Sequence, residues 1–377
     1  MQVDEAPPLP EPDRLDGAPH PRETERLFGH SAAEGAFLQA FNAGRLHHAW
    51  LISGPQGIGK ATLAWRITRF LLTAPEEGQE EGLFGAPQAA ESLDVASDHP
   101  VARRLRARSE PRLFHVTRSR NDKTGRLRDQ IVAEDVRDLS GFFGLKATDG
   151  GRRVVLVDAA DDMNTHAANA LLKMLEEPPE QTTLLLLSHQ PGRLLPTIRS
   201  RCRALPLMPL SKDDLAAALR QASFETGDAE AALSELSQGS VGAAIRLLGL
   251  EGAGLYADVV ALMNTLPRLD RALAIKLANA TTARGAEARF DLLFDLIELC
   301  LARLARAGAQ GTPPPEAVAG EAAVIARLAP TEMQARAWAE CARKIGERSR
   351  HGRAVNLDPA TLVLDTVFEL QRTAQAV

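Results

Sequence analysis

Cysteine is scarce in this chain. The 377 residues contain three cysteines, and the wide spacing of Cys202, Cys300 and Cys341 fits neither a disulfide framework nor a zinc-binding motif. No cysteine lies between residues 1 and 201, which excludes a four-cysteine zinc module from that part of the chain. We therefore predict no zinc or other metal site, and we interpret the cysteines as small buried side chains in a reducing compartment.

Long apolar runs and a strong net charge are also missing. No apolar run approaches the roughly 18 residues that span a bilayer, and a net charge of -5 gives no overall signature of nucleic-acid binding. The N-terminus is acidic and rich in proline, unlike a signal peptide. The sequence therefore predicts a cytoplasmic protein with no membrane partner, long enough for two or three domains.

Aromatic residues make up only 4% of the chain, and this affects how an arginine-rich segment is interpreted. Residues 103–128 hold ten cations and two acids, Glu110 and Asp122. One interpretation is a nucleic-acid-binding module, which would bind DNA with a strong dependence on salt concentration. Side chains that could stack on bases are nearly absent, so the pattern favours a solvated face.

A glycine-rich loop is the most informative feature that the sequence does contain. It follows an apolar run at 49–53 and precedes a helical pattern at 61–72. Gly54, Gly59 and Lys60 match G-x-x-x-x-G-K, in which backbone N–H groups converge on a phosphate and the lysine reaches the outer phosphates. An ordinary strand-to-helix turn is the alternative, and a second motif favours the nucleotide site.

The second motif is the all-apolar run 154–157, which ends in Asp158, as a strand buried on both faces would. Carboxyl ends of parallel strands are where open α/β sheets bind ligands. The candidate nucleotide-binding residues are therefore Gly54, Gly57, Gly59, Lys60, Thr62 and Asp158.

At two catalytic positions in this pair of motifs, the residue present lacks the functional group that ATP hydrolysis needs. The residue after the lysine normally carries a hydroxyl that holds Mg²⁺, but here it is Ala61. Thr62 is one residue late, about 100° around the helix. The acid that often follows the strand aspartate and orients water is replaced by Ala159. We expect a loop that can hold ATP without hydrolysing it.

Strand-like and helical patterns alternate up to about residue 208, which predicts a parallel sheet covered by helices. The predicted strands are 49–53, 113–117, 154–158, 183–188 and 203–207. The predicted helices are 31–44, 60–73, 131–143 and 164–176. Beyond 208 the pattern is helical, with three short helices at 211–221, 228–237 and 240–250, a longer one around 290–304, and a terminal helix after Asp358.

The residues themselves then show a resemblance. Residues 169–179 are predicted to form an amphipathic helix that ends at two prolines. The spacing of its apolar residues alone would not distinguish it from any other amphipathic helix. Their string Asn-Ala-Leu-Leu-Lys-Met-Leu-Glu-Glu-Pro-Pro, with Ser200-Arg201-Cys202 and the segments 27–30 and 44–49, resembles the delta-prime family of bacterial DNA polymerase III clamp-loader subunits. The resemblance is strong over about residues 25–250 and looser beyond.

This resemblance implies both an architecture and a role. The architecture is an α/β P-loop AAA+ core, a three-helix lid and an all-helical collar. The implied boundaries are a disordered tail at 1–24, the core at 25–208 with an insert at 74–112, the lid at 209–252 and the collar at 253–377. The role is to help other subunits of a five-membered ring place a sliding clamp on primed DNA for the polymerase holoenzyme.

The resemblance also assigns chemistry. Delta-prime subunits generally do not hydrolyse ATP, which agrees with Ala61 and Ala159, and Gly242 stands where active relatives place a phosphate-sensing arginine. Arg201 would act as an arginine finger on a neighbouring ATPase subunit. The alternative is an active AAA+ motor subunit, which Lys60 and Asp158 favour.

Overall fold

The structure of the chain is a computed structural model. The residues that it describes are 11–12, 14–74, 89–121, 123–144, 151–281 and 286–376. The chain divides into two compact units, Met1–Ser223 and Phe224–Val377. Each is described separately, and the boundaries of core, lid and collar stay a prediction.

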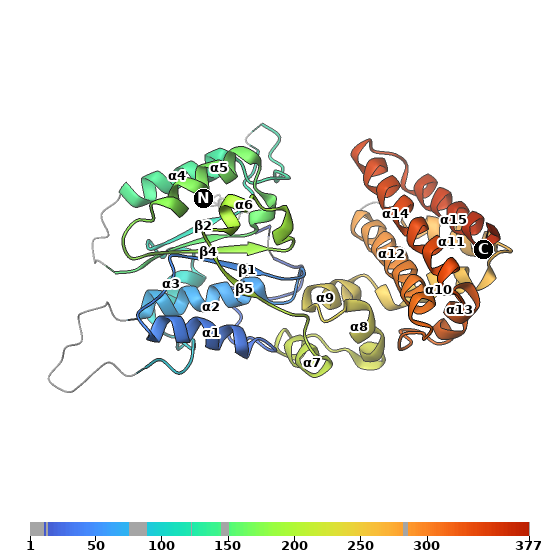
Figure 1. The fold of residues 1–377 in the computed structure, drawn as a ribbon, viewed down its shortest axis with the longest axis horizontal. Coiled ribbons are helices and arrows are strands. Elements are labelled where there is room, and N and C mark those ends of the chain that lie inside the picture. The colour runs from blue at the N-terminus through green and yellow to red at the C-terminus, as the bar shows by residue number, and fades with distance from the viewer. Residues whose placement is uncertain are drawn as a thin grey trace, which may run out of the picture. The chain divides into compact units, whose positions relative to one another are not determined.

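A five-stranded parallel sheet forms the centre of the first unit (Figure 1), in the order β2-β3-β4-β1-β5. The strands are β1 (Ala49–Ser53), β2 (Leu113–Val116), β3 (Arg153–Val157), β4 (Thr182–Ser188) and β5 (Arg203–Pro206). This confirms the predicted AAA+ α/β core, and each strand begins and ends within one residue of its predicted bounds.

The sheet is buried because helices cover both of its faces. Along β1, Trp50 and Ile52 pack with Phe37 and Leu63 on one face, while Leu51 belongs to a second cluster on the other. Alternation of this kind follows from the two-residue period of a strand. Figure 1 shows α1, α2 and α3 on the first face and α4, α5 and α6 on the second.

The helices of this unit confirm the four long predicted ones and add short ones. They are α1 (Ser31–Asn42), α2 (Lys60–Thr73), α3 (Pro100–Arg106), α4 (Ala133–Gly144), α5 (Thr165–Glu176), α6 (Pro196–Arg199) and α7 (Lys212–Gln221). The sequence interpretation did not include α3. Residues 75–88 of the predicted insert lie outside the described residues.

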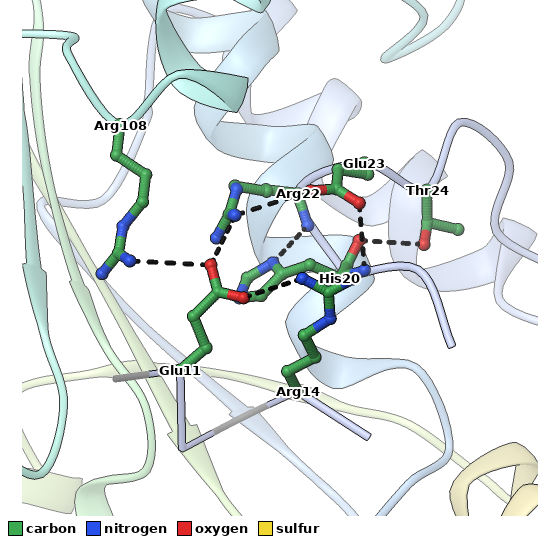
Figure 2. A network of polar contacts seen from close by, with 7 residues as sticks. All are labelled: Glu11, Arg14, His20, Arg22, Glu23, Thr24 and Arg108. Atoms are coloured by element: carbon green, nitrogen blue, oxygen red, sulfur yellow. Dashed lines mark hydrogen bonds and ion pairs between the residues drawn. The ribbon is translucent and has the colours of Figure 1, made fainter. Parts of the chain in front are cut away.

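The segment before α1 departs from the predicted disordered tail. Residues 1–10 and 13 lie outside the described residues, but 14–24 pack against the core, and His20 is only 1% exposed and meets Trp65 edge-on. Figure 2 shows Glu11 facing Arg14, Arg22 and Arg108, at 3.1, 2.5 and 3.6 Å. Arginine–glutamate pairs and the buried His20 hold this segment on the surface of the core, so it is ordered without apolar periodicity.

Helix α2 is tied to this segment by two buried guanidinium groups. Arg66 donates to Glu34 at 2.7 Å, to Asp94 at 2.8 Å and to the carbonyl of Glu25. Arg69 donates to the carbonyl of Thr24 at 2.7 Å. Burial, followed by repulsion from Arg66, lowers the pKa of Arg69 to about 10.

The second unit is helical throughout its described residues, as predicted. Its helices are α8 (Glu230–Ser237), α9 (Val241–Gly249), α10 (Gly252–Thr265), α11 (Arg271–Asn279), α12 (Glu287–Gln310), α13 (Glu321–Leu328), α14 (Glu332–Ala354) and α15 (Pro359–Ala376). Asp358 accepts a hydrogen bond from the Thr361 N–H at 2.8 Å and so caps α15, as expected. Within the described ranges, no helix is long and apolar enough to cross a membrane.

Candidate nucleotide-binding site

The glycine-rich loop lies between β1 and α2, at the carboxyl edge of the sheet. Gly54, Gly57 and Gly59 all have positive φ, at 146°, 75° and 105°. A Cβ on Gly54 would collide with the carbonyl of Leu207, and one on Gly59 would lie 2.9 Å from the Leu27 side chain. Glycine is therefore required for the close approach of this loop to its surroundings.

Lys60 opens α2 and is buried, with 3% of its surface exposed. Its ammonium donates to the carbonyls of Gly54 at 2.7 Å and Pro55 at 2.5 Å. Burial lowers the pKa of Lys60 to about 8, although the charges of Asp158 and Asp161 oppose the shift. The lysine therefore folds back onto its own loop, and among the described residues its ammonium forms no hydrogen bond with a carboxylate.

The positions that would hold Mg²⁺ differ in what they provide. Asp158 lies directly after β3, half-buried, and its N–H donates to Val116 of the neighbouring strand at 3.0 Å. Ala61 and Ala159 have no side-chain atom that can bind a metal. Thr62 is half-buried one residue further along α2. The structure thus brings the loop and Asp158 to one edge of the sheet.

Asp161 is a residue of this edge that the sequence interpretation did not select. It lies in a short 3₁₀ turn, η1 (Ala160–Asp162). Its carboxylate accepts hydrogen bonds from the Ser188 hydroxyl at 2.9 Å, the Gln190 N–H at 3.3 Å and the N–H of His189. Asp161 therefore links the ends of β3 and β4 beside Lys60. Burial, then the charge of Lys60, lowers the pKa of His189.

Arg201 lies elsewhere. It precedes β5, so it belongs to the amino edge of the sheet, opposite the loop. Its guanidinium donates to the Thr197 carbonyl at 3.0 Å and pairs with Glu176 at 2.9 Å, and its side chain is 35% exposed. Both partners are near helix ends at the same edge. The structure therefore does not bring Arg201 to the chain's own loop.

In the second unit, Gly242 lies in the first turn of α9, which Ser240 caps by accepting from the Ala243 N–H at 3.1 Å. Arg246, one turn later, pairs with Asp295 of α12. Among the residues that the structure describes, no group of three or more His, Cys, Asp or Glu side chains could hold a metal ion.

Comparison with known proteins finds similarity over about half of the chain. Residues 29–211 match the family described as "DNA polymerase III, delta subunit". A DNA polymerase III subunit delta' of Pseudomonas aeruginosa is 41% identical over 204 residues, and that of Escherichia coli is 31% identical over 210 residues. The chain is therefore similar to DNA polymerase III subunits delta' over about half of its length.

The matches to these delta-prime relatives are partial. They cover 54% and 56% of this chain, and 56% and 57% of the two relatives. The chain therefore spans little more than half the length of the curated relatives that it matches. Among solved structures, a DNA polymerase III gamma subunit-related protein of Thermotoga maritima aligns with 90% of this chain and 99% of its own, at 16% identity and a TM-score of 0.46.

Proposed function

We propose that the chain works in the cytoplasm as a non-hydrolysing delta-prime subunit of the clamp loader, helping to place a sliding clamp on primed DNA. The observation that carries this proposal is the state of the loop: Lys60 is bonded to loop carbonyls and followed by Ala61. Partners would be the motor subunits and delta in a five-membered ring, the clamp, and primed DNA reached through the complex.

The loop fits the phosphates of ATP but not a catalytic metal. A bound nucleotide would be surrounded by the loop N–H groups, Lys60, Thr62 and Asp158. Its phosphates would act as the anionic hydrogen-bond partner of the Lys60 ammonium. Mg²⁺ has no hydroxyl ligand at position 61, and water has no orienting carboxylate at position 159. Losses of such positioning groups cost several kcal/mol of transition-state stabilisation, so ATP would be bound without turnover.

The position of Arg201 supports its proposed role as an arginine finger on a neighbouring subunit. Its guanidinium is partly exposed and separated from its own loop by the length of the sheet. The pair with Glu176, which is 51% exposed, is a surface salt bridge worth about 0–1 kcal/mol, so exchanging the carboxylate for a phosphate costs little. A guanidinium presents a planar fork that matches phosphate oxygens.

An active motor subunit is the second candidate function. Lys60 and Asp158 favour it, because both belong to the usual phosphate and metal site. ATP turnover by the purified chain distinguishes the two candidates: phosphate release at the background rate supports the non-hydrolysing subunit, and robust turnover supports the motor subunit.

The proposed finger is tested by Arg201→Ala in an assembled clamp loader. We expect ATP turnover at the adjacent site to fall by about 10³–10⁵, with assembly intact. Arg201→Lys should restore little, because lysine keeps the charge but loses the fork. Arg199→Ala, an exposed arginine two residues away, is the matched control. Unchanged turnover with Arg201→Ala in a verified complex would return Arg201 to a purely structural ion pair.

A further inference from the structure

Glu176, the acidic partner of Arg201, is the last residue of α5. The end of this helix is fixed within the first unit. Leu175 is buried, and its carbonyl oxygen bonds Nε2 of His48 at 3.1 Å. Prolines at positions 178 and 179 stop a further helical turn. The carboxylate of Glu176 therefore projects from a firmly held helix end at the amino edge of the sheet.

Arg201 is held at the same edge by a second element. Its backbone N–H donates to the carbonyl of Ile198, a buried residue of α6, at 3.1 Å. Its guanidinium divides between two partners: Nη1 donates to the Thr197 carbonyl, and Nη2 pairs with Oε1 of Glu176. A guanidinium carries five N–H groups, so a phosphate that binds it has the Glu176 carboxylate as a close neighbour of like charge.

The position of Glu176 in its helix makes this pairing more favourable. Unpaired carbonyl groups give the carboxyl end of a helix a partial negative charge, which disfavours a carboxylate there. The guanidinium of Arg201 offsets this repulsion while the two side chains stay paired. Transfer of Arg201 to a phosphate would leave Glu176 without that compensation, so the pair favours the state in which Arg201 is not engaged.

We propose that Glu176 is a positioning residue that holds Arg201 in a resting position and thereby weakens the binding of ATP at the neighbouring site. The inference rests on the proposed role of Arg201 as an arginine finger. The carboxylate and the terminal phosphate of ATP compete for one guanidinium, so ATP has to displace Glu176. Such competition raises the ATP concentration at which the site fills. It leaves the rate of turnover unchanged, because Arg201 has left Glu176 once the site is filled.

The test is steady-state ATP turnover by the assembled clamp loader, with KM and kcat taken for the component that Arg201→Ala removes. Glu176→Gln keeps the size of the side chain but not its charge, and it should lower KM about twofold to fivefold at unchanged kcat, the range expected for an exposed ion pair. Glu176→Asp keeps the charge and should have a KM closer to that of the unaltered complex. Glu177→Gln is the matched control, since Glu177 is also exposed, and it should keep both constants.

Two results would overturn this proposal alone. One is an equal KM for Glu176→Gln and Glu177→Gln in complexes of verified assembly and unchanged thermal stability. The other is a lower kcat for Glu176→Gln, which would mean that Glu176 orients Arg201 for turnover instead of restraining it. Failure of the arginine finger gives a different result, because Arg201→Ala would then remove no component of turnover, and both proposals would fall together.

Discussion

Two of the buried cations, one from each compact unit, have pKa values that move in opposite directions. Lys60, at the sheet edge, has a pKa lowered to about 8. Arg303 of α12, 5% exposed, has a raised pKa: burial lowers it, but hydrogen bonds and the charge of Glu321 more than offset that effect. The contrast separates a cation bonded to a carboxylate from one bonded, within the described residues, to backbone carbonyls.

Arg303 is fully engaged. Its guanidinium bonds Glu321 through two nitrogens, at 2.7 and 3.0 Å, and also reaches the carbonyl of Pro315. Glu321, 1% exposed, accepts further hydrogen bonds from the Tyr256 hydroxyl at 2.6 Å and the Ala317 N–H at 2.7 Å. Burial is the first cause that raises the pKa of Tyr256, so it stays a donor.

Lys60 has no comparable partner. It donates to neutral carbonyls, and Asp158 and Asp161 act on it only through their charge. A buried ammonium that lacks a bonded carboxylate favours the arrival of an anion. The comparison teaches that burial alone does not fix the direction of a pKa shift, because the carboxylate bonded to Arg303 reverses it.

Breaking the engaged pair should have the largest effect on stability. Arg303→Met leaves Glu321 buried without its partner and should destabilise the second unit by about 3–5 kcal/mol in urea unfolding. Arg306→Met, an exposed arginine of the same helix, is the control. The double variant R303M/E321Q should recover part of the loss. A loss below about 1 kcal/mol for Arg303→Met would mean that this network is not structural.

Asp161→Asn should have an intermediate effect. Asparagine keeps one acceptor but places an amide donor where the carboxylate accepts from backbone N–H groups, at a cost of about 1–3 kcal/mol in thermal unfolding of the first unit. Asp162→Asn changes a carboxylate that is 37% exposed and paired with Arg118 at 3.4 Å, and should cost less than about 1 kcal/mol. Equal losses would show that Asp161 does not join the two strand ends.

The smallest effect is a pH dependence. Below pH 8 Lys60 is charged in both folded and unfolded chains; between about pH 8 and its ordinary 10.5 the unfolded chain keeps a proton that the folded chain has lost. Stability relative to Lys60→Met should therefore rise with pH in this window. Urea unfolding of both chains at pH 7 and pH 9 measures it. A constant difference between the two would contradict the lowered pKa.

The sequence predicted the sheet well because the three central strands each carry four consecutive apolar residues, as at 154–157. It missed α3, since Val101, Ala102 and Leu105 are its only buried residues and arginines surround them. It also missed Asp161, because the partners Ser188 to Gln190 are adjacent in the sheet but distant along the chain. The glycine-rich loop and Asp158 were predicted because both belong to motifs with a recognisable residue spacing. The carbonyl partners of Lys60 were not predicted, because they depend on how the side chain is buried in the fold, and residue spacing does not show this.

The guanidinium anchors of α2 have a mechanical consequence. The helix begins at Lys60 in the loop, and Arg66 and Arg69 fasten its later turns to the segment before α1 and to Asp94. The loop, its helix and the segment before α1 are therefore joined by direct hydrogen bonds, so we expect them to move as one rigid piece.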